Sequence, residues 1–290
     1  MVVALSVGCA LFYGAADFCG GLAARRMPAL AVLVWSQAIG LVVLLVALPL
    51  VGGVLHASDL AWGLACGVAA AVAIGMLYRA LAIGTMGVVS PITAVLAAAV
   101  PVLYALVRGD RPAPLALGGI ALALVAVILV SGAPPAAKSD EDAPLARLWH
   151  PNLLGPGIPE ALVAGFAFGF FFIALAQTHT DAGLYPLLST RLASLALLAG
   201  TGFAVRAPLR IHRPGLRLVA LCGSMDMGSN ILFILALHSG ALSVVAVITS
   251  LYPAATVALA AALLHERLGA VQWAGVLLAL AGVACIAFAR

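Results

Sequence analysis

Charged side chains are scarce in this sequence. Of 290 residues, only 8% are Asp, Glu, Lys or Arg, whereas 65% are hydrophobic. A soluble domain carries about 25% charged residues, so this chain has too little polar surface to cover a particle in water. The surrounding solvent is therefore lipid. The net charge of +4 is spread over the connections and forms no basic stripe with interleaved aromatics, which argues against a nucleic-acid partner.

Motifs that would indicate an enzyme or a nucleotide-driven machine are missing. The sequence contains no HExxH, GxSxG or GxxxxGK[ST] pattern, so hydrolase and ATP-driven chemistry are not indicated. The five cysteines lie in apolar stretches and form neither a CxxC pair nor a zinc-ligand spacing. We therefore expect small buried thiols, no cofactor, no metal site and no catalytic residues.

Long hydrophobic runs, in contrast, are abundant. A membrane-spanning helix needs about 20 mainly apolar residues. The sequence predicts ten such helices, at 2–23, 28–51, 60–82, 87–107, 114–132, 159–180, 184–205, 216–237, 241–263 and 269–289. The predicted fold class is an all-α integral membrane protein with ten transmembrane helices.

One long connection divides these helices into two sets of five. It covers 133–158, is rich in proline and contains a charged run. We therefore expect a first repeat at 1–132, a linker at 133–158 and a second repeat at 159–290. An odd number of helices per half places the second half in the membrane upside down relative to the first. In such inverted repeats the binding site lies near the mid-membrane interface of the halves.

An internal repeat supports this division. Residues 66–130 match 222–286 at nineteen positions with a constant shift of 156 and no gap. Chance matching in a chain this rich in Ala, Leu and Val gives about seven. Because one chain already contains both halves, a monomer is sufficient to enclose a site.

Several stretches resemble the EamA family of the drug/metabolite transporter superfamily. In the second half, Tyr252-Pro253 leads through an apolar helix to Glu266-Arg267-Leu268. The first half repeats this more loosely, from the stretch 88–94 to Gly109-Asp110-Arg111. The resemblance implies two inverted five-helix repeats in the cell membrane. It also implies transport of amino acids, other metabolites or drugs, mostly outward, without selecting among them.

Ionisable residues inside the spans are the first candidates for function. Each costs at least about 2.5 kcal/mol in hydrocarbon, so it usually has a partner or faces water. Asp226 and Asn230 lie four residues apart in one helix and face the same way. They either hold a substrate ammonium or an exchanged proton, or serve as structural contacts between helices.

Two further charges have open assignments. Asp17 lies beside glycines in the first predicted helix, where it either pairs with an arginine or caps a helical break. Arg191 binds a substrate carboxylate, pairs with Asp226 or Asp17, or extends to the membrane surface.

Uncharged side chains complete the candidate site. The polar and aromatic candidates for substrate binding or coupling are Trp35, Gln37, Tyr78 and Tyr252. Prolines remove a backbone hydrogen bond within the predicted helices 87–107 and 241–263. The candidate hinges are Pro91, Pro101 and Pro253.

These features predict a secondary active transporter, acting as an exporter, of a small polar or amphipathic metabolite such as an amino acid. It would work by alternating access of two inverted halves, with membrane lipid around it and protons as the coupling ion. A passive channel is the first alternative and an intramembrane enzyme the second. Saturable, counterflow-stimulated uptake distinguishes a carrier from both.

Overall fold

A computed structural model describes residues 1–24, 27–83, 86–132, 156–210, 213–264 and 269–288, and within these ranges the chain is helical, with no strand. The predicted linker therefore lies almost wholly outside the described residues, as does the Glu266-Arg267-Leu268 stretch. In chain order the helices are α1 (Val2–Ala24), α2 (Ala29–Val51), α3 (Ala57–Ile83), α4 (Met86–Val107), α5 (Pro114–Gly132), α6 (Ile158–Leu175), α7 (Tyr185–Ala204), α8 (Arg213–Leu237), α9 (Leu242–Thr249), α10 (Tyr252–Leu264) and α11 (Ala270–Phe288).

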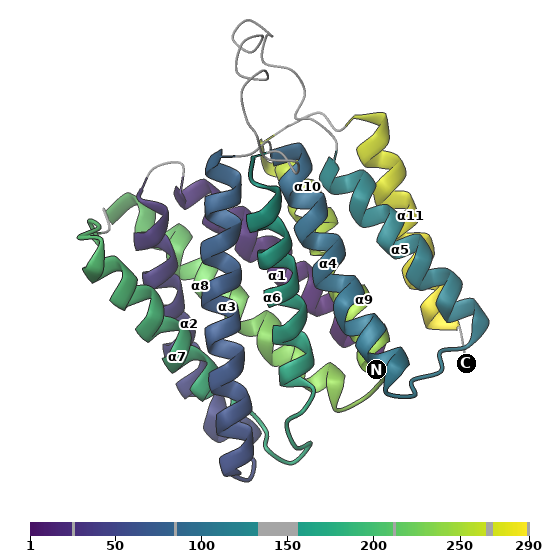
Figure 1. The fold of residues 1–290 in the computed structure, drawn as a ribbon, viewed down its shortest axis with the longest axis horizontal. Coiled ribbons are helices and arrows are strands. Elements are labelled where there is room, and N and C mark those ends of the chain that lie inside the picture. Colours follow the sequence, from purple (N-terminus) through teal and green to yellow (C-terminus); the bar gives the residue numbers. More distant parts are fainter. Residues whose placement is uncertain (25–26, 84–85, 133–155, 211–212, 265–268, 289–290) are drawn as a thin grey trace, which may run out of the picture.

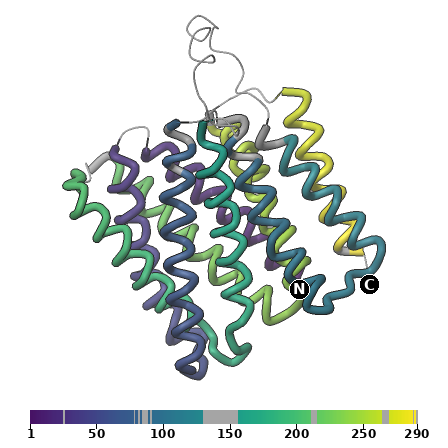
Figure 2. Tube along the Cα trace, in the orientation of Figure 1, coloured from purple at the N-terminus to yellow at the C-terminus, as the bar shows by residue number. Residues whose placement is uncertain are grey.

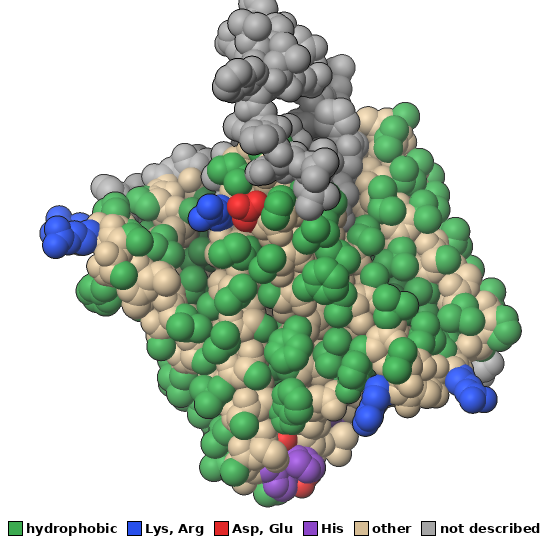
Figure 3. Space-filling model, in the orientation of Figure 1, with side chains coloured by type: hydrophobic (Ala, Val, Ile, Leu, Met, Phe, Trp, Pro, Cys, Tyr) green, Lys and Arg blue, Asp and Glu red, His purple; other side chains and the backbone are tan. Residues whose placement is uncertain are grey.

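The outside of this bundle is apolar. Large hydrophobic side chains are exposed along it, for example Val46 at 65% and Leu277 at 61%. Figure 3 shows hydrophobic side chains over the middle of the visible face and Lys, Arg, acidic and His side chains toward its ends. Lipid solvates such a surface, so the chain is an integral, multi-pass membrane protein.

Span lengths agree with this environment. Seven segments of the described chain are long and apolar enough to cross a bilayer. Three further apolar helices are shorter, at Ile92–Val107, Pro114–Leu129 and Ala270–Ile286. Each of these segments lies within one of the predicted stretches or overlaps it, but only seven have the length of a span.

Most helix ends lie close to the predicted ones, but the stretch 159–180 was predicted too long. Helix α6 ends at Leu175. Beyond it, the Gln177 amide donates to the Ile173 carbonyl at 3.2 Å and the Thr178 hydroxyl donates to the Leu175 carbonyl at 2.8 Å. Side chains that bond nearby backbone carbonyls compete with helix propagation. The following turn then reaches Gly183, whose φ of 59° suits glycine.

The predicted helix 241–263 is also not continuous, because α9 ends at Thr249 and α10 begins at Tyr252. At the break the Ser250 hydroxyl donates to the Val247 carbonyl at 2.7 Å. Pro253 lies in the first turn of α10, where no intrahelical N–H is required.

The candidate hinges of the first half lie inside a continuous helix. Pro91 and Pro101 do not interrupt α4, which runs unbroken from Met86 to Val107. Helices in membranes tolerate proline when neighbouring groups satisfy the freed carbonyls.

The two halves interlock rather than lying side by side. Helix α1 of the first half packs against α8, and α3 packs against α6 of the second half. In the same way α2 packs against α8, and α3 packs against α7. The counterparts of α1, α2 and α3 in the second half are α6, α7 and α8. The contact of α1 with α8 is therefore equivalent to that of α6 with α3, and the contact of α2 with α8 is equivalent to that of α7 with α3. Helices α5 and α11 pair with each other at one edge of the bundle (Figures 1 and 2).

Two repeat-related glycines allow this interlocking. A Cβ on Gly67 of α3 would lie 2.5 Å from the Thr190 carbonyl oxygen of α7. A Cβ on Gly223 of α8 would lie 2.3 Å from the Ser36 carbonyl oxygen of α2. Both distances are shorter than a carbon–oxygen contact permits, so only glycine lets the backbones approach this closely. The repeat thus places equivalent close contacts in both halves.

We expect Gly67→Ala and Gly223→Ala each to lower the free energy of unfolding by about 1–3 kcal/mol, because the added methyl group pushes two backbones apart. Thermal unfolding of the purified protein in detergent measures this. Gly75→Ala is the matched control in α3, because no atom lies within 4 Å of its added Cβ. Equal stability of all three variants would contradict the close-packing argument.

Candidate functional site

A buried arginine joins the two halves at the centre of the candidate site. Arg191 of α7 is only 4% exposed. Its guanidinium donates to the Gln37 side-chain oxygen of α2 and to the Asp226 carboxylate of α8. The hydroxyl of Ser194, one turn along α7, donates to the same Gln37 oxygen at 3.3 Å. Of the alternatives for Arg191, the structure therefore shows the ion pair with Asp226.

Small residues make room for the guanidinium. A Cβ on Gly40 of α2 would lie 3.3 Å from the Arg191 Cζ and 3.2 Å from the Gly223 carbonyl oxygen. Any larger residue at position 40 would therefore press on the ion pair. Sequence reasoning did not select Gly40 or Ser194. Gly40 follows Gln37 by three residues, and a helical face shared by the two is the only signal that would have found it.

A second polar layer continues from Asp226 toward the first half. The Asn230 amide nitrogen donates to the Asp226 backbone carbonyl at 2.7 Å. The Tyr13 hydroxyl of α1 donates to the Asn230 side-chain oxygen at 3.0 Å. The Tyr13 and Tyr252 rings lie 6.1 Å apart at 58°, so α10 contributes to the same layer. Asn230 and Tyr252 thus join Asp226 and Arg191 in one cluster.

Asp17 adds a second negative charge to this region. Its side chain is exposed on α1, and it lies close enough to Asp226 and Tyr252 to interact with both electrostatically. The Asp226 side chain is 30% exposed, whereas that of Arg191 is 5% exposed. When both carboxylates are ionised, they and the one guanidinium leave one negative charge uncompensated among these three residues. Such a cluster favours a cation.

Other predicted residues lie elsewhere. Trp35 is 44% exposed, and its indole nitrogen donates to the Leu209 carbonyl at 2.8 Å, near the end of the bundle. The structure therefore does not bring Trp35 to the cluster. Tyr78 lies on α3, but its side chain is outside the described part of the chain. Pro253 follows the α9–α10 break, next to Tyr252.

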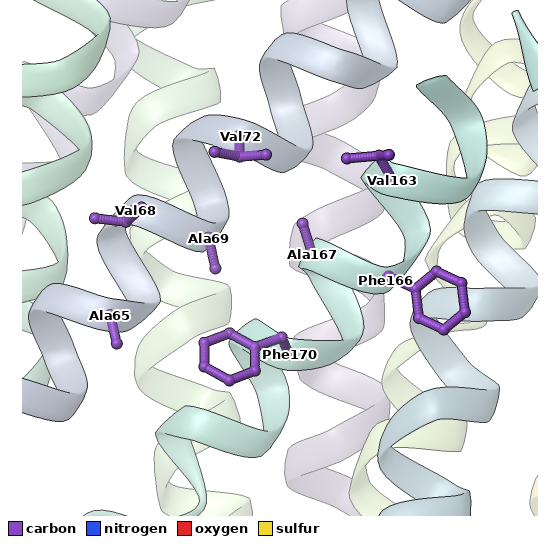
Figure 4. A pocket seen from close by; sticks show the side chains of 8 residues that line it. All are labelled: Ala65, Val68, Ala69, Val72, Val163, Phe166, Ala167 and Phe170. Carbon is purple, nitrogen blue, oxygen red and sulfur yellow. The ribbon is translucent and has the colours of Figure 1, made fainter. Parts of the chain in front are cut away.

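A surface hollow lies apart from this cluster. It measures about 620 Å³ and lies between α3 and α6 (Figure 4). Every residue that lines it is apolar, and several are exposed, including Val68 at 47% and Phe166 at 54%. A hollow of this composition suits lipid chains rather than a polar metabolite, so the polar cluster remains the candidate site.

A helical multi-pass bundle with repeated halves and a charged cluster between them is the architecture of membrane transporters. The sequence matches the EamA-like transporter family over residues 1–132 and 155–288, and the chain belongs to this family. One solved crystal structure, described only as that of a protein, superposes with a TM-score of 0.74 at 16% identity and covers 99% of this chain and 96% of its own. This likeness concerns the fold. No curated protein matches the chain.

We expect the Arg191–Asp226 pair to be energetically coupled. Arg191→Met and Asp226→Asn each leave the partner charge without its counterion, which is strongly unfavourable in a buried site. The double variant removes both charges, so its loss of stability should be smaller than the sum by about 0.5–3 kcal/mol. Thermal unfolding in detergent of the four proteins measures this coupling. Strictly additive losses would show that the two side chains do not interact.

Proposed function

We propose that this protein is a secondary active transporter in the cell membrane. It exports a small polar or amphipathic metabolite such as an amino acid, by alternating access of two inverted halves. The family supplies the class of protein, and the charged cluster at the junction of the halves supports the substrate class. The observation that carries the proposal is the ion pair between Arg191 of α7 and Asp226 of α8.

This pair is complementary to a zwitterion. An amino acid carries an ammonium and a carboxylate on one carbon, so it can insert between the two side chains and replace each partner. The carboxylate then accepts hydrogen bonds from the Arg191 guanidinium, whose planar fork suits it. The ammonium then binds Asp226, with Asp17 as the second negative charge. Gln37 orients the Arg191 guanidinium through its hydrogen bond, and Asn230 donates to the backbone carbonyl of Asp226.

The arrangement of the halves supports inversion. The N-terminus lies at the lower edge of the bundle in Figure 1, whereas α6, the first helix of the second half, begins at the upper edge near the grey linker. Exchanging the two halves turns the contact of α1 with α8 into the contact of α6 with α3, and both contacts are present. A site placed between such halves opens to one side or the other as they rock.

The break between α9 and α10 supplies a place for that movement. Residues 250–251 form no helix, and Pro253 lacks the N–H that would bridge the gap. Rocking of α10 about this break would move Tyr252 against Tyr13 and thereby change access to Asn230. In this proposal Pro253 is the hinge, and Pro91 and Pro101 allow α4 to bend.

The uncompensated charge supports coupling to protons. When substrate leaves, the two carboxylates of Asp17 and Asp226 face one guanidinium. A proton on one carboxylate neutralises the cluster. A substrate with a net positive charge, such as a cationic amino acid, replaces that proton on the next binding event, whereas a zwitterion adds no net charge. Export of a cationic substrate is thereby exchanged for inward movement of a proton.

A thermal-shift screen of the purified protein against amino acids, nucleosides and cationic drugs tests the substrate class. We expect zwitterionic amino acids to raise the melting temperature, because they bind only the folded cluster. A ligand found in this way should show saturable, counterflow-stimulated uptake in liposomes. Uptake without saturation or counterflow would indicate a channel instead.

Asp226→Asn tests the cluster itself. We expect it to weaken ligand binding by at least about tenfold, because one ion pair with the ammonium is lost. Arg79→Gln is the matched control. It also removes a charged side chain from a long helix, but Arg79 is 67% exposed and pairs with Glu160 at 3.3 Å near one end of the bundle. Unchanged affinity and pH response in Asp226→Asn would remove this residue from the site.

A further inference from the structure

A second cluster of polar side chains lies at the opposite end of α3 from Arg79. His56 directly precedes α3, Asp59 lies in its first turn, and His179 belongs to the turn after α6. One donor atom from each of these three residues lies within 4.8 Å of the other two. Histidine and acidic side chains gather at the lower end of the molecule in Figure 3, below α3 and α6. The transport mechanism above does not use these residues.

Hydrogen bonds hold the two rings in place. The His179 Nδ1 lies 2.9 Å from the Asp59 Oδ1, which also accepts the His179 backbone N–H at 3.1 Å. The His56 Nε2 lies 3.1 Å from the Asp181 Oδ1. The two imidazole rings are 4.5 Å apart at 34°. Each bond engages one ring nitrogen, and the His179 Nδ1 is the one that faces Asp59. A bound cation would replace this hydrogen bond, so that the ring nitrogen and the carboxylate both become its ligands.

The Asp59 carboxylate supplies an independent sign of a missing partner. Its side chain is fully buried, and its Oδ2 forms no hydrogen bond within the described chain. A buried carboxylate oxygen without a partner is costly, and a bound cation would satisfy it. Nearby backbone fixes the position of the cluster, because the Val54 N–H donates to the Asp181 carbonyl at 2.8 Å.

We propose that His56, Asp59 and His179 form a binding site for a first-row transition-metal ion such as Zn²⁺. Two imidazoles and one carboxylate suit such an ion, whereas Mg²⁺ and Ca²⁺ take oxygen ligands. Zinc ligands in a tetrahedral site lie about 3.4 Å apart, so small side-chain rotations bring these donors into range. Asp181 orients His56 from behind, in the manner of a carboxylate–histidine–metal triad.

The ion would connect the two halves of the transporter. His56 and Asp59 belong to the first half, and His179 belongs to the second. This consequence rests on the proposed function: if transport requires the halves to separate at this end, a bound ion holds the end closed and inhibits transport. The site itself does not depend on that step.

Cobalt and zinc titrations test the site on the full chain, purified in detergent without a polyhistidine tag and stripped of metal. We expect one Co²⁺ per chain with the visible absorption of an imidazole-bound ion, and a rise in melting temperature with Zn²⁺ but not with Mg²⁺. His179→Gln and His56→Gln should each weaken Co²⁺ binding by more than about tenfold. His238→Gln, a histidine outside the cluster, should leave it unchanged.

Two results would overturn the site: no Co²⁺ absorption in the unmodified protein, or equal binding by the His179→Gln, His56→Gln and control variants. If His179→Gln does not fold, the result of His56→Gln decides. The His56 side chain is 32% exposed and its partner Asp181 is 59% exposed, so this substitution disturbs the packing least.

Counterflow in liposomes with and without Zn²⁺ tests the clamp separately. We expect Zn²⁺ to inhibit the unmodified protein and not His56→Gln. Inhibition absent despite bound Zn²⁺ would overturn the clamp alone. Absence of counterflow without any metal would contradict the proposed transport while the Co²⁺ titration still decides the metal site.

Discussion

The structure depends on a simple constraint: a charge placed inside an apolar bundle needs a partner there. Arg191 cannot remain 4% exposed in lipid-surrounded protein without a counterion and a hydrogen-bond acceptor. Asp226 supplies the first and Gln37 the second. Because these partners come from α8 and α2, the requirement to pair one guanidinium fixes the positions of helices from both halves of the chain.

Close helix packing makes this pairing available. The guanidinium lies against Gly40, and the Gly223 carbonyl lies just beyond it. Gly223 in turn brings α8 onto α2 through its contact with the Ser36 carbonyl. The same repeat position in the first half, Gly67, brings α3 onto α7 without any charge nearby on α3. One scaffold contact therefore occurs twice, whereas Asp17, Arg191 and Asp226 have no charged residue at the equivalent position of the other half.

That difference explains what could be predicted from the sequence. Helix positions and the family were predictable, because apolar runs of about 20 residues and a repeat with a constant shift are local properties of the chain. Asp226 and Asn230 could be grouped because they share a helical face. The pairing of Arg191 with Gln37 could not be derived, since these residues lie in different halves and no spacing rule relates them.

The errors have equally specific causes. Trp35 was grouped with Gln37 because they are near neighbours in sequence, but a helix turns about 100° per residue and points the two side chains in different directions. Pro91, Pro101 and Pro253 were all candidate hinges, yet of the three only Pro253 lies beside an interruption, the one between α9 and α10. The His56–Asp59–His179 cluster was missed because 120 residues separate Asp59 from His179.

Charge balance also limits how the proposed transporter can cycle. Arg191 neutralises one carboxylate, so an empty site with both Asp17 and Asp226 ionised carries a net negative charge between the halves. Closing the bundle around that charge removes it from water, at a cost of several kcal/mol. A proton cancels it, and so does a substrate that carries one net positive charge; either one lowers the barrier to reorientation. A zwitterion brings equal and opposite charges and leaves the balance unchanged, so it needs a proton bound beside it. A site with this charge count therefore moves readily only when it holds one net positive charge, which limits leak through the empty carrier.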